Sequence, residues 1–502
     1  MLMPQPEADR LVQAATADLA SGRLMHAAAL LEQALRVDPR HKMALTKQAE
    51  LALLRKDPQR ALTLTDTVLA IEPNFAPAWH QRAAAFWAAS RQTEARQAAR
   101  KAVDIQPPNP EFRLRFARFA AWTGHGADAR DVLAPLLATG HHDPANHAAA
   151  LGMLGELAIA EGRFDAANPY FDQALALCPN LDVIRMQRGM NRLRLGQFGT
   201  GWTDYAAREA IPELRAATSP DRASQTWQGQ PLAGKTLLVT DDQGHGDSIQ
   251  FFRYLPLLRD RGAAHITWHT FPPLVRLLSA AAPYATVVDT LPDGARFDIQ
   301  CDSTSLPRWF ETEFDGIPAP RQYLWPSANP KSARKHPADR RLKVGLAWSG
   351  DARHSRDHLR SIPADLFLTV ADVPGISFHS LQYAARSDDR PTLAARPAIA
   401  RDIQKAADFA DTAALVASLD LVIAVDTAIV HLAGALGKPV WIVLHVAADW
   451  RWLTDRSDSP WYPSARLFRV TPAEWLGGAG WRPVINRVAT ALAAAERDRL
   501  KP

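Results

Sequence analysis

Residues 419–439 read LDLVIAVDTAIVHLAGALGKP, and this stretch decides the architecture of the second half of the chain. Six of its first seven residues are apolar, which is typical of a strand that is buried on both faces. A helix-compatible run follows, for which Asp426 or Thr427 can serve as N-cap. Gly437 and Pro439 end that run. The stretch therefore predicts a buried strand that passes directly into a helix.

Similar short apolar runs recur through the second half of the chain, with helical stretches between them. The predicted strands are residues 235–240, 264–268, 343–348, 376–381, 419–425 and 440–444. Strands that alternate with helices indicate parallel sheets of the doubly wound kind. A Pro-rich stretch, 317–337, separates two such sets. We therefore expect two facing halves that bind ligands at the carboxyl ends of their strands.

The first 200 residues have a period of 34 residues. Three sets of residues recur at this interval: Pro39, Pro73 and Pro107; Ala27, Ala61 and Ala95; and Ala34, Val68 and Ala102. The interval is that of tetratricopeptide repeats (TPRs), in which two antiparallel helices make one unit. We expect each proline to end the second helix of a unit, and the small residues to lie where helices approach closely. Such a solenoid exposes a concave face that suits an extended peptide.

The domain organisation follows from these patterns. We predict a TPR α-solenoid of about five repeats over residues 1–210 and a linker rich in Pro, Ser and Gln over 211–234. Residues 235–333 and 334–502 form the two Rossmann-like, doubly wound halves. The predicted fold class is therefore α + α/β.

The composition excludes several classes of protein. With 47% hydrophobic and 22% charged residues, the 502-residue chain is globular rather than disordered. The net charge of +5 comes from dispersed Lys and Arg, so we expect no nucleic-acid partner. Cys178 and Cys301 are too few for a disulfide framework or a zinc site. With no signal peptide and no run of about 18 apolar residues, we expect a cytoplasmic protein without a transmembrane segment.

The sharpest chemical signal lies at the start of the helix that follows strand 419–425. Thr427 and His431 are four residues apart, so they share one face of the first turn. Free backbone N–H groups, the positive end of the helix dipole and an imidazole then converge where a diphosphate would sit. The alternative is a capped helix with a buried histidine. The position after a buried strand favours phosphate binding.

A second motif, DDQGHGDSIQF at residues 241–251, follows the first predicted strand of the other half. Gly244 and Gly246 permit a tight turn whose backbone lies close to a ligand. Asp247 stands at the mouth of the next helix, with Gln250 one turn behind it. A carboxylate that faces the cleft could take a proton from an acceptor hydroxyl. Taken alone, the motif favours the alternative that Asp247 only caps the helix.

Two further segments carry candidate ligand-binding side chains. The loop 350–361 gathers the basic residues Arg353, His354, Arg356, His358 and Arg360. Arg360 is best placed to neutralise phosphate charge, and a solvated basic loop is the alternative. Aromatic residues at 449–452 and 459–463 could form a base-stacking or sugar-binding wall, although dense aromatics favour packing. His141–Asp143 lacks further ligands at metal spacing, so we predict a polar loop and no metal site.

These motifs carry a resemblance to a known family. Residues 419–439 resemble the signature of the heptosyltransferase-like glycosyltransferases, in which a strand is followed by D-[ST]-[AG]-x-x-H-x-A-[GA]-A-x-G-x-P. Residues 244–247 resemble the amino-terminal G-x-G-D of that family, whose members adopt the metal-independent GT-B fold. The repeats, residues 249–256 and the aromatic blocks narrow the resemblance to bacterial TPR-linked glycosyltransferases, including alphaproteobacterial flagellin glycosyltransferases.

The resemblance implies roles for individual residues. Asp247 matches the catalytic-base aspartate, but His245 stands where the family has Leu, so either of the two could be the base. The acceptor-side half, 235–333, matches the family loop at Gly244, Gly246 and Gln250. In the donor-binding half, 334–502, the family's donor-diphosphate loop is matched by Asp426, Thr427, Ala428 and His431. Arg360 with Ser361 matches the family's basic loop after the first strand of that half.

The implied activity is that of an inverting, metal-independent hexosyl-, heptosyl- or nonulosonyl-transferase. It would move a sugar from a nucleotide-sugar to an acceptor hydroxyl, with no cofactor and no metal. The implied acceptor is Ser or Thr of a flagellin-like protein, recruited by the TPR groove. One alternative is a lipid-linked or polysaccharide glycan as the acceptor. The other is a non-catalytic TPR scaffold with a degenerate transferase domain.

Overall fold

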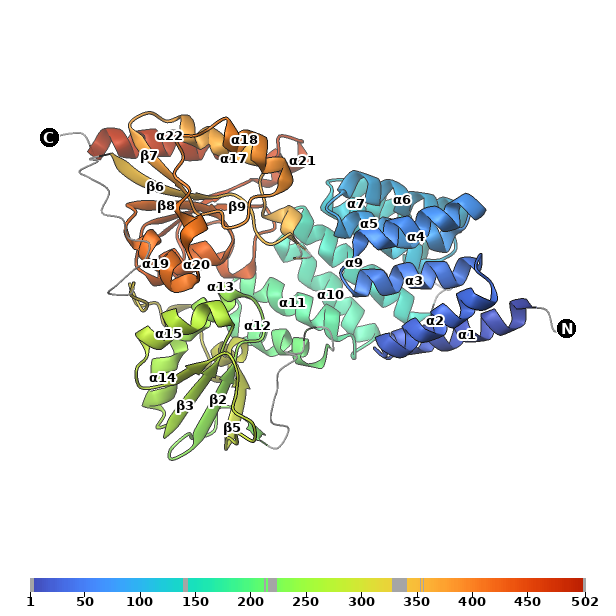
Figure 1. Ribbon diagram of the computed structural model, residues 1–502, viewed down its shortest axis with the longest axis horizontal. Helices are drawn as coiled ribbons and strands as arrows, with labels where there is room; N and C mark the ends of the chain where they lie inside the picture. Colours follow the sequence, from blue (N-terminus) through green and yellow to red (C-terminus); the bar gives the residue numbers. More distant parts are fainter. Residues whose placement is uncertain are drawn as a thin grey trace. The chain divides into compact units, whose positions relative to one another are not determined.

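The computed structural model describes residues 4–138, 143–211, 214, 224–326, 341–352, 354 and 356–499. Most of the predicted linker lies outside these described residues, as do His141, His142 and Arg353. The chain forms two compact units: the first comprises Met1–Pro179 with a few residues from Ala352 on, and the second, which begins at Asn180, comprises the rest. Figure 1 labels most of their helices and strands.

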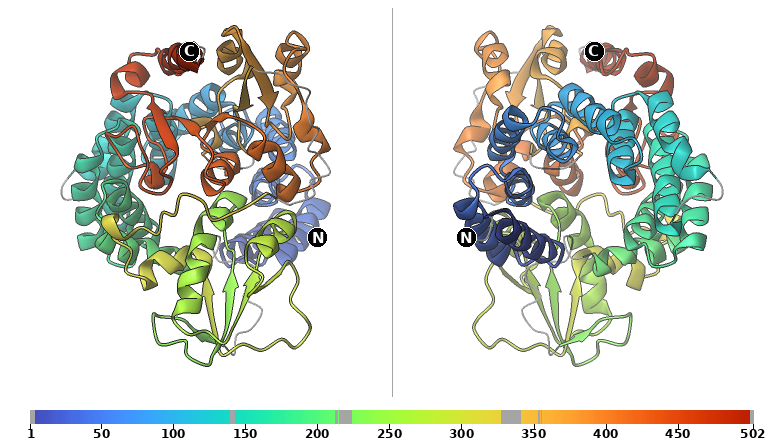
Figure 2. Two further views of the ribbon diagram at one scale, coloured as in Figure 1. Left: turned by 90° about the vertical axis from the view of Figure 1, so that its left-hand side faces the viewer. Right: turned by 90° about the vertical axis from the view of Figure 1, so that its right-hand side faces the viewer.

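Antiparallel helix pairs build the first unit (Figure 1, Figure 2). Its helices are α1 (Pro4–Ala20), α2 (Leu24–Val37), α3 (Lys42–Leu54), α4 (Pro58–Ile71), α5 (Ala76–Ala88), α6 (Gln92–Ile105), α7 (Pro110–Trp122), α8 (Gly126–Leu137), α9 (Pro144–Ala160) and α10 (Phe164–Leu177). Each helix packs against the next one along the chain. The predicted N-terminal TPR solenoid is therefore confirmed.

The periodic residues lie where the repeat predicts them. Ala27, Ala61, Ala95 and Ala129 are all 0% exposed, because neighbouring helices approach closely at these positions. The three periodic prolines each follow the end of α2, α4 or α6 by two residues. Proline cannot continue a helix, so it separates one pair from the next.

A fourth periodic feature appears in the turn between the two helices of a pair. The backbone angle φ is positive at Gly22 (74°), Lys56 (61°), Ser90 (60°) and Gly124 (78°), which are 34 residues apart. Glycine adopts this left-handed conformation freely, whereas other residues do so at a cost of about 1 kcal/mol. The turn geometry repeats although the residue type does not, so the sequence pattern did not reveal it.

The second unit begins with two more helices, α11 (Asp182–Arg194) and α12 (Phe198–Tyr205). Phe198, Trp202 and Tyr205 belong to the same buried apolar cluster as the strands of this unit. The Trp202 indole N–H donates to the carbonyl oxygen of Thr312 at 2.8 Å. These two helices, which the sequence places at the end of the predicted solenoid, are thus part of the core of the second unit.

Two parallel sheets of five strands follow (Figure 1). The strands are β1 (Gln225–Thr226), β2 (Thr236–Thr240), β3 (His265–His269), β4 (Thr286–Val288), β5 (Ile299–Asp302), β6 (Leu342–Ala347), β7 (Ile376–Ser380), β8 (Leu421–Val425), β9 (Val440–Leu444) and β10 (Ala465–Arg469). The order is β1-β5-β2-β3-β4 in the first sheet and β10-β9-β8-β6-β7 in the second. All six predicted strands are present, and the sheets are compatible with Rossmann-like halves.

Helices connect these strands. They are α13 (His245–Phe251), α14 (Leu255–Asp260), α15 (Val275–Ala281), α16 (Leu306–Trp309), α17 (Ala364–Phe367), α18 (Arg390–Ala394), α19 (Phe409–Ala417), α20 (Ala428–Ala435), α21 (Pro472–Leu476) and α22 (Arg482–Arg499). Every residue of β8 is buried, as its apolar run predicts. β2 leads into α13 and β8 leads into α20, and these two helices pack against each other. This packing brings the two predicted motifs together.

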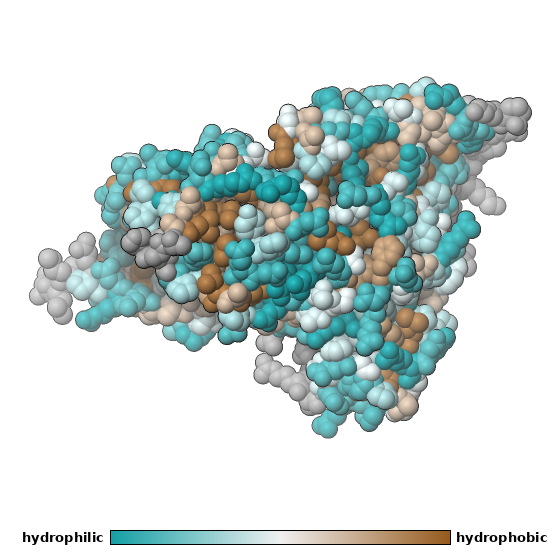
Figure 3. Space-filling view, turned by 180° about the vertical axis from the view of Figure 1, so that it is seen from behind, coloured by the Kyte–Doolittle hydropathy of each residue, from teal (hydrophilic) through white to brown (hydrophobic). Residues whose placement is uncertain are grey.

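The exposed surface is mainly hydrophilic on the face that Figure 3 shows, with smaller apolar patches. Within the described ranges, no helix combines the length and the apolar character needed to cross a membrane.

Candidate functional site

The two motifs lie side by side at the starts of α13 and α20. A Cβ atom at Gly246 would stand 2.8 Å from Cδ2 of His431 and 3.5 Å from Cα of Ala428. Carbon atoms in favourable contact are about 3.5–4 Å apart, so a larger residue would force a shift. We expected Gly244 and Gly246 to form a tight turn, but neither has a positive φ. Gly246 is required instead by the close approach of His431.

His431 is a buried, neutral histidine. Its Nδ1 lies 2.8 Å from the hydroxyl of Tyr462, and its ring stacks on Trp452 with 5.5 Å between centroids. Burial, reinforced by the charge of Arg451, lowers the pKa of His431 to about 3. When Tyr462 donates to Nδ1, the imidazole carries its own proton on Nε2. That nitrogen lies 3.9 Å from Oδ1 of Asp426. The imidazole can therefore donate a hydrogen bond but contributes no charge.

Thr427 presents an unsatisfied hydroxyl at the start of α20. It is the N-cap residue, but its side chain makes no capping hydrogen bond. Its Oγ1 is buried and has no hydrogen-bond partner in the described structure. Buried polar atoms without a partner are rare and costly in native proteins. A hydroxyl and the backbone N–H groups of a helix start, next to Ala428, are suited to an anion.

Arg360 reaches the same place from the loop after β6. Its Nη1 donates to the carbonyl oxygen of Asp426 at 3.3 Å. A Cβ atom at Gly350 would lie 2.6 Å from the guanidinium of Arg360, so the glycine leaves room for this side chain. The carboxyl group of Asp426 is itself perturbed, since burial and the charge of Asp449 raise its pKa. The structure thus brings Arg360 to the predicted diphosphate loop.

Ser361, predicted beside Arg360, takes part in a network within its own loop. Its hydroxyl donates to Oδ1 of Asp357 at 2.7 Å and accepts from the backbone N–H of Gly350 at 3.0 Å. Arg386 also donates to it, at 3.0 Å. These contacts fix the shape of the loop that carries Arg360.

Asp247 is the third residue of α13, and both of its carboxylate oxygens have partners. Oδ2 accepts from the backbone N–H of Gly244 at 2.9 Å, so Asp247 does cap its own helix. Oδ1 forms an ion pair with Arg451. The side chain remains 21% exposed, so the remaining lone pairs can still accept a proton. The capping role and the predicted base role are therefore compatible.

Arg451 is a site residue that sequence reasoning missed. It lies on the short 3-10 helix η11 (Trp450–Trp452), and its side chain is 8% exposed. It donates to Asp247, to Gln250, and to Oδ1 of Asp449 at 2.8 Å. Burial opposes its charge, but the carboxylates of Asp449 and Asp247 outweigh this and raise its pKa. The sequence did carry one signal, an arginine within a run of aromatic residues. Aromatic residues are commonly buried, and a buried arginine needs carboxylate partners, so the run could have indicated an ion pair.

His245 and Gln250 flank Asp247 on α13. The His245 ring contacts Phe271 and Phe409, with centroids 5.0 and 5.2 Å apart, and burial lowers its pKa. Gln250 is fully buried, and its Oε1 accepts from Arg451. His245 thus packs in an aromatic slot, while Gln250 holds Arg451.

The aromatic segments near the site are packed rather than open. Trp450, Trp452, Trp461 and Tyr462 are each at most 1% exposed. The packing interpretation of residues 449–452 and 459–463 therefore agrees with their burial. Among these packed aromatic residues, Tyr462 also contacts the candidate site, because its hydroxyl orients His431.

Acidic residues at the end of β2 have structural partners. Asp242 pairs with Arg208 and accepts from the Thr304 hydroxyl at 2.8 Å. Asp241 accepts from the Trp268 indole N–H at 3.1 Å. Across the described residues, no group of three or more His, Cys, Asp or Glu side chains is placed to hold a metal ion.

Comparison with known proteins defines the class of the first unit. Residues 12–74, 86–154 and 148–181 match family models described as tetratricopeptide repeat. The chain is also 30% identical over 392 residues to Protein FlbA of Caulobacter vibrioides. The alignment covers 72% of this chain and 62% of FlbA, so the chain spans less than two thirds of that relative. Because the first unit ends at Pro179, a match to 72% of the chain extends into the second unit.

Some solved structures are similar to part of the chain. A thermophilic TPR protein of Thermus thermophilus has 21% identity over 37% of this chain and 99% of its own, with a TM-score of 0.33. PilW, a type IV pilus biogenesis factor, has 21% identity over 40% of this chain and 92% of its own, with a TM-score of 0.34. The first TPR of Spaghetti, bound to an HSP90 peptide, has 18% identity over 23% of this chain and 91% of its own, with a TM-score of 0.22.

Proposed function

We propose that the second unit is a metal-independent glycosyltransferase of the GT-B type, which moves a sugar from a nucleotide-sugar to an acceptor hydroxyl. The observation that carries this proposal is the close approach of Gly246 and His431. It brings together two motifs that follow β2 of one parallel sheet and β8 of the other. Ligands of such sheets bind at the carboxyl ends of the strands.

The diphosphate of the donor would lie at the start of α20. The Thr427 hydroxyl, left without a partner, would donate to a phosphate oxygen, as would Nε2–H of the neutral His431. Arg360, held at the carbonyl of Asp426, would supply positive charge. Negative charge develops on the phosphate oxygen as its bond to the sugar breaks. Donors fixed in advance stabilise that charge most effectively.

Asp247 would act on the acceptor side. The acceptor oxygen attacks the anomeric carbon, its proton passes to the Asp247 carboxylate, and the nucleotide leaves with the electron pair of the broken bond. Arg451 and the N–H of Gly244 orient the carboxylate for this step. His245 is the less suitable base, because its ring packs against Phe271 and Phe409.

The acceptor in this proposal is Ser or Thr of a flagellin-like protein. The TPR array supports it, because stacked repeats present extended surfaces for polypeptides. A truncated chain without the TPR array tests whether the acceptor is a protein. The truncation should remove the residues before Asn180 and keep α11 and α12, because these helices belong to the core of the second unit. Loss of protein modification in this truncated chain supports a protein acceptor. Unchanged acceptor choice favours a glycan acceptor.

Mass spectrometry of transferred sugar tests the proposed activity. The purified full-length chain is incubated with a panel of nucleotide-sugars and with proteins from cells that lack its gene. We expect a protein whose mass increases by one sugar with the native chain, and a loss of at least 100-fold with Asp247→Ala or His431→Ala. Undiminished transfer by both variants would overturn the mechanism.

A further inference from the structure

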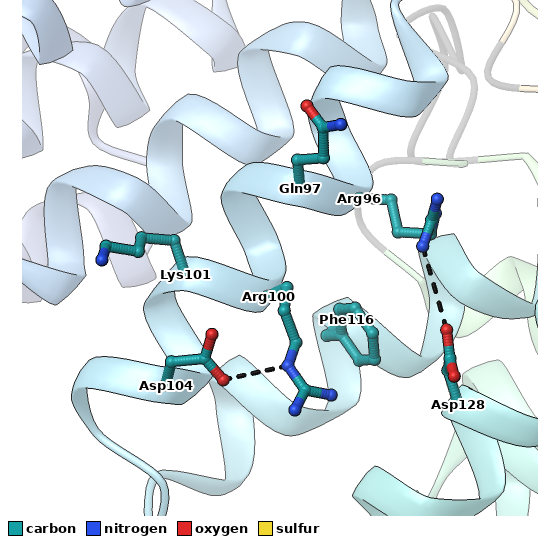
Figure 4. A pocket seen from close by; sticks show the side chains of 7 residues that line it. All are labelled: Arg96, Gln97, Arg100, Lys101, Asp104, Phe116 and Asp128. Carbon is teal, nitrogen blue, oxygen red and sulfur yellow. Dashed lines mark hydrogen bonds and ion pairs between the residues drawn. The ribbon is translucent and has the colours of Figure 1, made fainter.

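The first unit carries a pocket of about 350 Å³ that the proposed transfer reaction does not use (Figure 4). α6 supplies its lining residues Arg96, Gln97, Arg100, Lys101 and Asp104. α7 and α8 supply one lining residue each. The pocket therefore lies mainly on α6, the second helix of the pair α5/α6.

Both carboxylates of the lining are already paired. Arg100 Nε lies 2.9 Å from Oδ1 of Asp104, one helical turn away. Arg96 Nη1 lies 3.8 Å from Oδ2 of Asp128, the residue that α8 contributes. Figure 4 shows the two pairs on either side of Phe116, the residue from α7. Each carboxylate of the pocket is thus paired with an arginine of the same lining.

Several hydrogen-bond donors of the lining remain unused. Arg96 Nε is buried and has no hydrogen-bond partner in the described structure. Within the part of the chain that the structure describes, the Lys101 ammonium has no hydrogen-bond or ion-pair partner. Arg100 uses only its Nε, in the contact with Asp104, so its Nη groups donate no hydrogen bond there. The lining holds three cations and two carboxylates, and this net positive charge suits an anionic ligand.

We propose that this pocket binds a short acidic segment of a partner polypeptide, with its carboxylate side chains on Arg96, Arg100 and Lys101. Residues 96–104 of α6 span about 12 Å at 1.5 Å per residue, which matches three or four residues of extended chain. The volume is about ten times that of a water molecule in the liquid, too large for one inorganic ion. The Phe116 ring, 5.4 Å from the Arg100 guanidinium, gives the pocket an apolar floor.

Fluorescence anisotropy with dye-labelled hexaglutamate tests this site on the full-length chain. We expect saturable binding at low ionic strength that weakens as salt is added, because exposed charges are screened. The double variant Arg100→Glu/Lys101→Glu should weaken binding at least 10-fold. Arg55→Glu/Arg60→Glu, which also reverses two exposed charges of the first unit, is the matched control and should change binding less than twofold. Far-UV circular dichroism verifies that each variant keeps its helices.

Three results would overturn the proposal. They are no binding of hexaglutamate by the native chain, equal binding by the double variant, and displacement of the peptide by inorganic phosphate beyond the effect of chloride at equal ionic strength. The last result would mean a free-anion site. The measurement uses no sugar donor, so its outcome is independent of the transferase proposal.

Discussion

Arg451 forms an ion pair with Asp247, although 204 residues separate them in the chain. Asp247 follows β2 of the first sheet, and Arg451 follows β9 of the second. The pair lies beside the contact of Gly246 with His431 on α13 and α20. Only 8% of the Arg451 side chain is exposed, and a buried cation that loses its carboxylate partner is costly, so Arg451 is held in one position. The contact therefore fixes the candidate base relative to the second sheet.

We predict that Asp247→Asn lowers sugar transfer by about 10²- to 10⁴-fold, the range expected on loss of a general base. Asn keeps the shape of Asp and can still accept from Gly244, so the fold should survive. His245→Leu is the matched test of the other candidate base and should keep activity within about fivefold. Initial transfer rates measure both. A larger loss with His245→Leu than with Asp247→Asn would assign the base to His245.

Gly246→Ala should destabilise the second unit and weaken nucleotide binding, because its methyl group would overlap His431. Overpacking of this kind costs about 1–3 kcal/mol. Gly244→Ala is the control, since a Cβ there would meet only Oδ2 of Asp247, at 3.2 Å. Urea unfolding of Gly246→Ala, His431→Ala and the double variant forms a double-mutant cycle. Additive effects would contradict the contact, whereas we expect His431→Ala to remove most of the cost.

Acid should destabilise the second unit through its buried histidines. Nδ1 of His445 accepts from the backbone N–H of Ala447 at 3.0 Å, and the ring packs against Trp475 and Trp481. Burial lowers the pKa of His445 to about 3, and it lowers the pKa of His431 to about 3 as well. An unfolded histidine titrates near 6.5, so the folded state binds fewer protons between pH 3 and 6.5. The contribution of these two histidines to the free energy of unfolding is therefore fully present above pH 6.5 and is lost as the pH falls towards 3.

The expected slope is at most about 1.4 kcal/mol per pH unit for each such histidine. His445→Asn, whose amide oxygen can replace Nδ1 as the acceptor, should remove about half of the combined slope of the two histidines. Denaturant unfolding at a series of pH values between about 4.5 and 7.5 measures the slope of the free energy of unfolding against pH. An unchanged slope in His445→Asn would contradict this assignment.

The turns of the helix pairs offer a stability prediction in the first unit. Ser90 has φ 60°, so Ser90→Gly should stabilise this unit by about 0.5–1 kcal/mol. Gly124→Ala should destabilise it by about 1 kcal/mol through the backbone alone, because a Cβ there meets nothing within 4 Å. Ala89→Gly, at φ −86°, is the control and should not stabilise. Thermal unfolding of the helical signal ranks the variants, and a lower midpoint for Ser90→Gly would refute the argument.

The fold was predictable wherever local sequence carried the signal. β8 is buried at every residue, so its apolar run stands out in the sequence. β10 was missed because Arg466 and Arg469 interrupt it, and the very short β1 and β4 give too little pattern. The 34-residue period predicted the helix pairs. It did not predict that α11 and α12 join the second core, which depends on burial of Phe198 and Trp202 against distant segments.

The candidate site was predictable only in part. Thr427, His431 and Gly246 belong to contiguous motifs, and the structure brings them together. Arg451 and Tyr462 were missed as site residues, because their roles arise from contacts with Asp247 and His431 that tertiary packing creates. The reason for a glycine at position 246 also differs from the one we expected. Gly246 makes room for the side chain of His431 and is not needed for a tight turn.

Isothermal titration of the full-length chain with nucleoside diphosphates and CMP tests the central claim most directly. The account predicts saturable binding of at least one of these nucleotides. Thr427→Val, which removes only the unpartnered hydroxyl, and Arg360→Gln should each weaken that binding at least 10-fold, while Arg60→Glu on the first unit should leave it unchanged. No nucleotide binding by the native chain, or equal binding by Thr427→Val and Arg360→Gln, would contradict the account.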